Sequence, residues 1–270
     1  MKPVLLFAAI ALLCLVLLLL FTPLSTAAAV LCCIGVFVLL QLLCLVFFWA
    51  VSLTVPYQSP LKKQNRICRY GIGAISSVIN FYCGVHPVLT GMEKLPKEGR
   101  FVFVCNHRSA FDPLLVMDRL RDFNIAFISK PSNLRIPFVG RLANAYGYLA
   151  LDRENDRNAL KTILTAVDYL KRDVCSIGIY PEGTRSKTGE LLPFHAGSFK
   201  VAQKAKVPIV VASVRGSENV RRAKLFSGTR IYLNIIEVIP AETVCALRTN
   251  ELSEQVRESI RKDLAFAEEG

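Results

Sequence analysis

The stretch Phe101–Pro113 reads FVFVC-NHRSAFDP. Its first five residues are apolar and rich in β-branched and aromatic side chains, which predicts a buried strand. The polar segment behind them ends in Asp112-Pro113. Because proline favours the first turn of a helix, we expect a helix over Leu114–Leu120. A strand followed by a short loop and a helix is typical of an α/β fold.

The same alternation continues toward the C-terminus. We expect strands at Phe101–Cys105, Ile125–Ser129, Tyr148–Leu151, Cys175–Tyr180, Pro208–Val214 and Arg230–Val238. Helical periodicity marks Leu114–Leu120, Arg157–Lys171, Gly197–Lys206 and Glu251–Phe266. This pattern predicts one α/β domain over residues 61–270, with a mostly parallel central sheet.

The N-terminal part is different, because residues 3–61 contain no charged residue. Two apolar blocks, Val4–Phe21 and Ala27–Val51, approach or exceed the roughly 20 residues that a helix needs to cross a bilayer. The short linker around Pro23 suits a tight turn. We therefore expect a hydrophobic helical hairpin over residues 1–60.

Two other interpretations of the hairpin stay open. Lys2 and the small residues Ala27–Ala29 also fit a cleaved signal peptide, and a hairpin can lie in one leaflet without crossing. The basic residues Lys62, Lys63 and Arg66 follow the second block. The positive-inside rule then predicts that the C-terminal domain lies on the cytoplasmic face of the membrane.

The charge and the cysteine and histidine content limit the kinds of partner and site that we expect for this chain. Lys2 is the only charged residue before Lys62, so the other 32 Lys and Arg and all 21 Asp and Glu give the C-terminal part a net charge of +11. A basic domain beside a membrane segment indicates contact with anionic phospholipids, and no basic–aromatic module predicts nucleic-acid binding. The nine cysteines show no C-x-x-C spacing and the chain has only three histidines, so we expect neither disulfides nor a metal site.

His107 and Asp112 stand five residues apart at the exit of the first predicted strand. A histidine oriented by a carboxylate is a general base that can deprotonate an alcohol near neutral pH. This chemistry would serve acyl transfer or hydrolysis. The pattern also has a structural interpretation, in which Asp112 is the N-cap of the following helix and His107 is a hydrogen-bonded loop residue.

Polar residues suited to an anion follow two more predicted strands. Arg153 and Arg185 carry guanidinium groups that match a phosphate, and Gly183 would let the backbone approach it closely. Thr184 offers a hydroxyl, and Glu182 could orient an arginine or accept a hydrogen bond from a substrate hydroxyl. Because ligands bind at the carboxyl ends of strands in α/β sheets, we expect these residues near His107. A surface ion pair of Arg153 and an ordinary turn at Pro181 are the alternatives.

Four segments in this order resemble the 1-acyl-glycerol-3-phosphate acyltransferase family of glycerolipid acyltransferases. They are Asn106–Asp112, Leu151–Arg153, Tyr180–Arg185 and Val207–Val210. The third segment is the most specific, because its similarity extends through Ser186 to Gly197. Tyr180 is a mild departure, since the family often has phenylalanine there.

The resemblance implies a glycerolipid-acyltransferase fold and transfer of an acyl group from a thioester to lysophosphatidate. His107 and Asp112 would be catalytic, and Arg153, Glu182, Gly183, Thr184 and Arg185 would bind the acceptor. No cofactor is implied, with acyl-CoA or acyl-acyl carrier protein as co-substrate. Glycerol-3-phosphate or another lysophospholipid as acceptor, a thioesterase, and a non-catalytic membrane-anchored lipid-binding protein are the alternatives.

Overall fold

The computed structural model describes residues 2–21, 25–54, 60–152, 155–186, 188–222 and 228–269. Its α-helices are α1 Lys2–Phe21, α2 Thr26–Thr54, α3 Arg66–Tyr82, α4 Phe111–Arg119, α5 Pro131–Leu134, α6 Val139–Tyr146, α7 Asp156–Lys171, α8 Lys200–Ala205, α9 Ala241–Ala246 and α10 Thr249–Glu269. Its strands are β1 Val85–Thr90, β2 Val102–Cys105, β3 Ile125–Ser129, β4 Leu149–Ala150, β5 Ser176–Ile179, β6 Ile209–Arg215 and β7 Thr229–Ile239. The predicted α/β class is confirmed.

Within the described residues, the seven strands form one sheet in the order β1-β7-β6-β2-β5-β3-β4. Every neighbouring pair is parallel except β6 and β7, which are antiparallel. The sheet is therefore mostly parallel, as predicted. Among the described elements, β1 was not predicted, because its sequence includes Pro87 and polar residues. The helices α3, which begins in the basic cluster at Arg66, α5, α6 and α9 were not predicted either.

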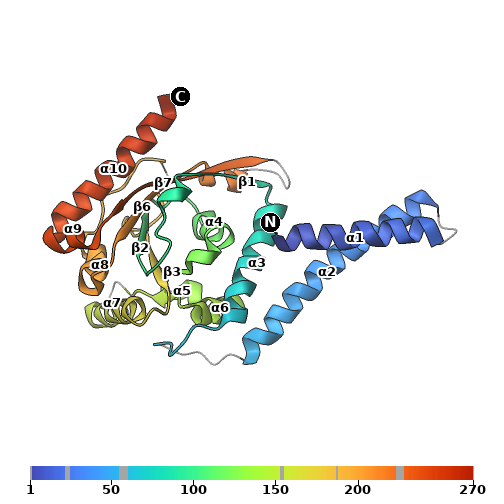
Figure 1. The fold of residues 1–270 in the computed structure, drawn as a ribbon, viewed down its shortest axis with the longest axis horizontal. Coiled ribbons are helices and arrows are strands. Elements are labelled where there is room, and N and C mark those ends of the chain that lie inside the picture. Colours follow the sequence, from blue (N-terminus) through green and yellow to red (C-terminus); the bar gives the residue numbers. More distant parts are fainter. Residues whose placement is uncertain are drawn as a thin grey trace.

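The helices cover the sheet in two layers. In Figure 1, α3, α4 and α6 lie on one side, and α7, α8 and α10 lie on the other. The chain leaves β2 through α4 toward one layer, and it leaves β5 through α8 toward the other. Because β2 and β5 are adjacent, their carboxyl ends flank a point where the connections diverge, which is the place where open α/β sheets bind ligands.

Burial explains why these segments form strands. All residues of β2 and β5 are buried, as expected for central strands of a sheet that helices cover on both faces. In β7, Ile231, Leu233 and Ile235 are buried while the residues between them are half-exposed. This alternation is typical of a strand with one face in the core.

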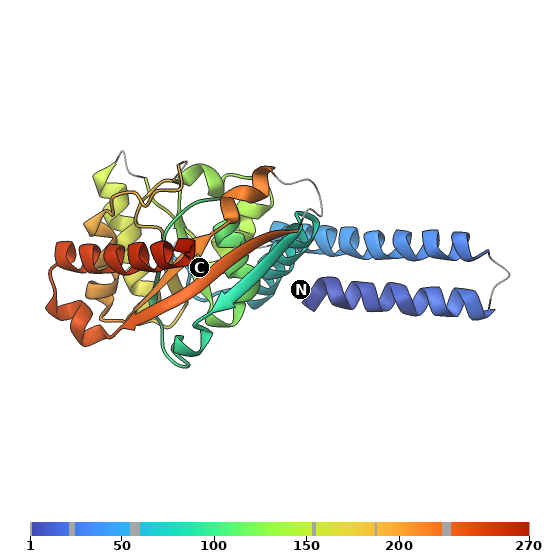
Figure 2. The same cartoon turned by 90° about the horizontal axis from the view of Figure 1, so that it is seen from above.

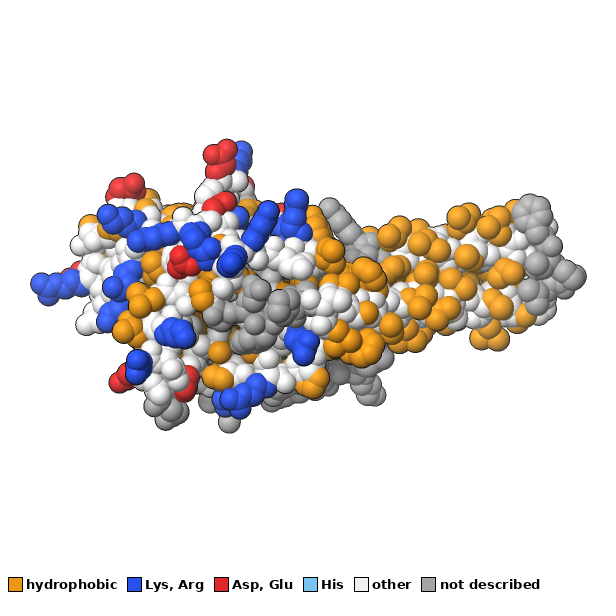
Figure 3. Space-filling view, turned by 90° about the horizontal axis from the view of Figure 1, so that it is seen from below, with side chains coloured by type: hydrophobic (Ala, Val, Ile, Leu, Met, Phe, Trp, Pro, Cys, Tyr) orange, Lys and Arg blue, Asp and Glu red, His pale blue; other side chains and the backbone are white. Residues whose placement is uncertain are grey.

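The apolar N-terminal blocks form two helices that lie side by side and extend away from the α/β domain (Figure 2). Helix α2 is long and apolar enough to cross a membrane by length and composition, whereas α1 contains a shorter apolar stretch, Leu5–Leu20. Apolar side chains cover the hairpin surface in Figure 3, while Lys and Arg lie on the α/β domain. The predicted turn at Pro23 lies outside the described residues. The domain boundary at residue 60 stays a prediction.

Helix α3 joins the hairpin to the domain. Gln41, buried in α2, donates a hydrogen bond from Nε2 to the hydroxyl of Tyr82 at the end of α3, at 3.0 Å. A Cβ atom on Gly71 would lie 2.4 Å from the ring of Phe48, so this glycine lets α3 pack closely against α2. The segment Gly71–Gly73 is thus part of a helix that packs against the hairpin.

Candidate functional site

The exit of β2 brings His107 and Asp112 together. Nδ1 of His107 lies 2.8 Å from Oδ2 of Asp112. The Asp112 side chain is 2% exposed and the His107 side chain is 18% exposed. Since a carboxylate oxygen accepts, Nδ1 is the donor in this contact, and in a neutral imidazole of this tautomer Nε2 has the free lone pair. This is the arrangement that a histidine base requires.

Asp112 is the second residue of α4 and not its N-cap, which is Ala110. The same oxygen that meets the imidazole accepts hydrogen bonds from the backbone N–H groups of Arg108 and Ser109, both at 2.8 Å. Asp112 therefore folds the loop back on itself and orients His107 at the same time. The carboxylate in the first helical turn also interacts favourably with the helix dipole.

The exit of β5 forms a tight turn. The N–H of Gly183 donates to the carbonyl oxygen of Tyr180 at 3.0 Å, with Pro181 in the second position of the turn. Gly183 has a φ of 72°, which a glycine adopts without strain. The turn at Pro181 is thus real, and it points Glu182 toward the end of β2.

The loop after this turn binds the backbone of His107. The N–H of His107 donates to Oε1 of Glu182 at 2.5 Å, and its carbonyl oxygen accepts from the N–H of Ser186 at 2.9 Å. The other oxygen of Glu182 accepts from the N–H of Leu192 at 3.0 Å. The structure thus brings Glu182 to the His107–Asp112 pair, and in this arrangement two backbone donors already contact its carboxylate.

Glu182 is 4% exposed. Its burial raises the pKa of the carboxyl group, and the hydrogen bonds from His107 and Leu192 act in the opposite direction. Burial of a carboxylate is tolerated when its oxygens have hydrogen-bond donors, and here each oxygen has one.

A stack of three rings supports the histidine from one side. The imidazole of His107 stacks on the ring of Tyr180, with centroids 4.1 Å apart and planes 15° apart. Tyr180 stacks in turn on Phe127 of β3, at 5.0 Å and 6°. Aromatic contacts of this kind restrict the ring that they hold.

Thr184 and Arg185 follow the turn and are exposed, so they are accessible to an anionic ligand near the histidine. The structure thus brings together six of the seven predicted site residues at the adjacent exits of β2 and β5: His107, Asp112, Glu182, Gly183, Thr184 and Arg185. The seventh, Arg153, lies outside the described residues.

This arrangement has parallels in known proteins. The Acyltransferase family model matches residues 86–215. Over 185 residues the chain is 30% identical to the 1-acyl-sn-glycerol-3-phosphate acyltransferase of Borreliella burgdorferi, which covers 67% of this chain and 72% of that protein. The chain belongs to this acyltransferase family.

Other members of the acyltransferase family are similar to this chain over smaller shares of their own length. The Saccharomyces cerevisiae 1-acyl-sn-glycerol-3-phosphate acyltransferase is 28% identical over 187 residues, covering 68% of this chain and 61% of that protein. The Escherichia coli enzyme of the same name is 34% identical over 143 residues, covering 53% and 56%. The chain thus spans less than two thirds of these two relatives.

The fold is also that of a solved member of the acyltransferase family. The crystal structure of the 1-acyl-sn-glycerophosphate acyltransferase of Thermotoga maritima matches 84% of this chain and 95% of its own, with a TM-score of 0.59 and 23% identity. The match confirms the predicted glycerolipid-acyltransferase-type α/β fold.

Two residues of the site were not predicted from the sequence as functional. Asn106 donates from Nδ2 to the carbonyl oxygen of Val214 at 2.9 Å and accepts from the N–H of Val214 at 2.7 Å, so it joins the exits of β2 and β6. Tyr180 holds the imidazole. Local sequence does not indicate this contact, because it depends on the pairing of Val104 with Ile179, which brings the exits of the two strands side by side.

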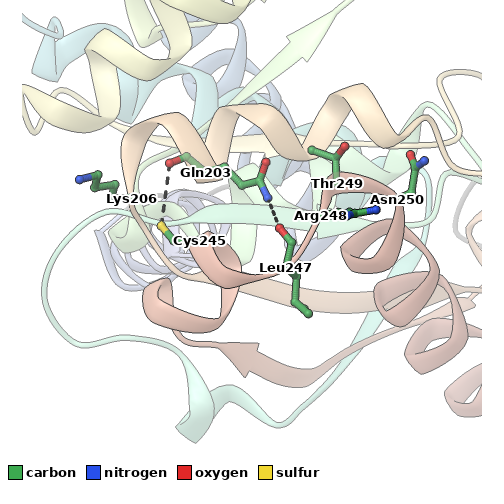
Figure 4. A pocket seen from close by; sticks show the side chains of 7 residues that line it. All are labelled: Gln203, Lys206, Cys245, Leu247, Arg248, Thr249 and Asn250. Atoms are coloured by element: carbon green, nitrogen blue, oxygen red, sulfur yellow. Dashed lines mark hydrogen bonds between the residues drawn. The ribbon is translucent and has the colours of Figure 1, made fainter.

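A cavity of about 700 Å³ lies elsewhere, between α8 and the start of α10 (Figure 4). Its lining is Gln203, Lys206, Cys245, Leu247, Arg248, Thr249 and Asn250, and it includes no predicted site residue. Helix α8 leads into the beginning of β6, whereas His107 follows the carboxyl end of the parallel strand β2. The cavity therefore lies near the opposite end of these strands from His107. The N–H of Arg248 already donates to Oε2 of Glu251 at 2.8 Å, which places an acidic side chain at the start of α10.

Proposed function

We propose that this protein transfers a fatty acyl group from an acyl thioester to the free hydroxyl of lysophosphatidate and so makes phosphatidate. The observation that carries the proposal is the contact of His107 with the buried Asp112 at the exit of β2, with the Glu182–Arg185 segment beside it. The family names of its relatives support the same reaction.

His107 acts as the general base. Its Nε2 takes the proton from the acceptor hydroxyl while the hydroxyl oxygen attacks the thioester carbonyl carbon. The tetrahedral intermediate then expels the thiolate, which receives the proton from the imidazolium. Asp112 holds the imidazole and stabilises its charged form. The acceptor hydroxyl is the nucleophile, so the protein carries no acyl group itself.

Arg185 and Thr184, together with Arg153, bind the phosphate of the acceptor. Exposure of Thr184 and Arg185 beside the base supports this role, and a guanidinium matches two phosphate oxygens at once. Gly183 lets the phosphate approach the backbone. Holding both substrates in place is worth on the order of 7–11 kcal/mol at most, so positioning and base catalysis both contribute.

The hairpin anchors the domain in the membrane where the acceptor and product reside. Its uncharged sequence and the length of α2 support membrane association, and the basic residues after it support a cytoplasmic domain. A cytoplasmic site would receive the acyl group from acyl-CoA or acyl carrier protein.

The direct test incubates the membrane-bound protein with lysophosphatidate and a long-chain acyl thioester, and follows free thiol and phosphatidate. We expect both products in equal amounts and a loss of about 10²–10⁴-fold in kcat for His107→Ala. Thiol without phosphatidate would instead identify a thioesterase, and product only with glycerol-3-phosphate or another lysophospholipid would change the acceptor.

The phosphate role has its own test. In Arg185→Ala we expect a raised KM for lysophosphatidate, because the charge-assisted contact with phosphate is lost. Arg261→Ala, on the exposed surface of α10, is the matched control and should leave KM unchanged. An unchanged KM in Arg185→Ala would remove Arg185 from the phosphate site.

A further inference from the structure

The loop Tyr180–Ser186 holds His107 at three separate points. Glu182 accepts from the N–H of His107 at 2.5 Å, and the N–H of Ser186 donates to its carbonyl oxygen at 2.9 Å. The ring of Tyr180 covers one face of the imidazole at 4.1 Å. Asp112 contacts Nδ1 as well. The backbone N–H, the backbone carbonyl oxygen and the ring of His107 are therefore all held.

Glu182 makes a link between two backbone segments. Oε1 accepts from His107 and Oε2 accepts from Leu192 at 3.0 Å, ten residues further along the chain. The side chain is 4% exposed. A substrate hydroxyl that bonded to Glu182 would have to compete with these backbone donors, and an amide nitrogen that lost its buried partner would be destabilised.

Tyr180 contributes its ring and not its hydroxyl. The ring lies between His107 and Phe127, nearly parallel to both. The hydroxyl oxygen is enclosed and has no hydrogen-bond partner among the residues that the structure describes. An unpaired buried hydroxyl does not stabilise the fold, so the useful contact is the stack.

We propose that Glu182 and Tyr180 are positioning residues that fix the backbone and the ring of His107, and that Glu182 does not bind the acceptor. This inference rests on the proposed function, since it takes His107 as the base. Catalytic groups must stay within about 0.5 Å and 10–20° of their working geometry, which explains why one histidine is held at so many points.

Glu182→Gln tests the first half. The Gln side chain keeps one oxygen acceptor, and its NH₂ group faces the second backbone N–H, so one of the two bonds is lost. We expect kcat to fall by about 10–100-fold, the scale of a small misplacement of a catalytic group, with the KM for lysophosphatidate unchanged. Glu190→Gln, the same substitution at an exposed position of the same loop, should leave both constants unchanged.

The KM for lysophosphatidate distinguishes a Glu182 that binds the acceptor from a Glu182 that positions His107. A raised KM with an unchanged kcat would show that Glu182 contacts the acceptor, and wild-type values for both would show that the link to the backbone does not matter. Either result overturns the inference for Glu182. Circular dichroism of the variant in detergent checks that a fall in kcat occurs in folded protein.

Tyr180→Leu and Tyr180→Phe test the second half. Leucine fills space without a ring, so we expect a reduced kcat, an unchanged acceptor KM and a shifted pH profile of kcat/KM, since the environment of the imidazole changes. Phenylalanine returns the ring without the unpaired hydroxyl and should rescue these values. If Tyr180→Phe is as impaired as Tyr180→Leu, the hydroxyl acts and the stacking role is wrong.

His107→Ala, measured in parallel, separates this inference from the proposed function. Full activity in His107→Ala would show that His107 is not the base. It would then also overturn the positioning role of Glu182 and Tyr180. An inactive His107→Ala with unaffected Glu182→Gln and Tyr180→Leu would overturn the positioning role alone.

Discussion

At the scale of single residues, one oxygen atom organises the His107–Asp112 pair. Oδ2 of Asp112 meets Nδ1 of His107 and two backbone N–H groups, each at 2.8 Å. Burial of a carboxylate is costly unless donors surround it. Because the backbone donors belong to the same loop, Asp112 keeps its position whether or not the imidazole changes its charge.

Glu182 makes stability depend on pH. Burial raises the pKa of its carboxyl above the ordinary 4.5, so its contribution to the free energy of unfolding is present below pH 4.5 and is lost as the pH rises through the raised value. Glu182→Gln lacks this carboxyl. We therefore expect the melting temperature of the wild type, relative to that of Glu182→Gln, to decrease as the pH rises from about 4.5.

Melting followed by circular dichroism in detergent at a series of pH values checks this prediction. The relevant quantity is how the difference between the two melting temperatures changes with pH. The substitution also removes a hydrogen bond, and this loss adds an amount to the difference that does not depend on pH. A difference that stays constant, or one with the opposite slope, would contradict the burial argument.

At the scale of elements, the packing of β5 against β3 supports the ring stack. A Cβ atom on Gly178 would lie 2.5 Å from Cε1 of Phe127, so only glycine leaves room for that ring in its present place. Phe127 is 2% exposed and cannot turn outward freely. The small residue in one strand thus sets the position of the aromatic ring on which Tyr180 rests.

Gly178→Ala should therefore destabilise the fold and slow the reaction. We expect a loss of about 1–3 kcal/mol in the free energy of unfolding from overpacking, together with a lower kcat as the stack shifts. Chemical denaturation and steady-state kinetics measure the two effects. Gly197→Ala is the control, because nothing lies within 4 Å of an added Cβ atom there. Equal stability of the two variants would show that Phe127 moves without cost.

At the scale of the whole molecule, the hairpin exposes much more apolar surface than a soluble domain tolerates. Leu12 of α1 is 59% exposed and Leu31 of α2 is 70% exposed, and apolar side chains cover the face of the hairpin that Figure 3 shows. Contiguous apolar surface of this size is typical of a lipid or protein contact. The hydrogen bond from Gln41 to Tyr82 joins this surface to the α/β domain.

The full chain should therefore stay in the membrane fraction after washing with about 1 M salt, which shortens the Debye length to about 3 Å and weakens surface charge contacts. Sedimentation followed by immunoblotting checks this. A variant with Lys62→Gln and Lys63→Gln should sediment equally well, since we expect the apolar helices to provide the anchor. Release of the wild type by salt would show that charge contacts, and not the apolar helices, hold the protein on the membrane surface.

Much of the site was predictable because its residues are local in sequence. Asn106–Asp112 contains both members of the His107–Asp112 pair, and a strand followed by a loop and a helix brings residues five apart into contact. The role of Tyr180 was not predictable in the same way, since its partners His107 and Phe127 come from two other strands. The same holds for Glu182, whose residue type fits both a ligand contact and a backbone link.

By itself, the sequence determined the apolar hairpin, the strands β2 to β7, the helices α4, α7, α8 and α10, and the order of the motifs, because periodicity and hydrophobicity act over short stretches of chain. Only the tertiary structure decided that β1 joins the sheet beside β7, that β7 runs antiparallel to β6, and that both oxygens of Glu182 meet backbone donors. These features depend on which distant segments share a register and which buried N–H groups need an acceptor. Such requirements arise only when the whole chain is packed.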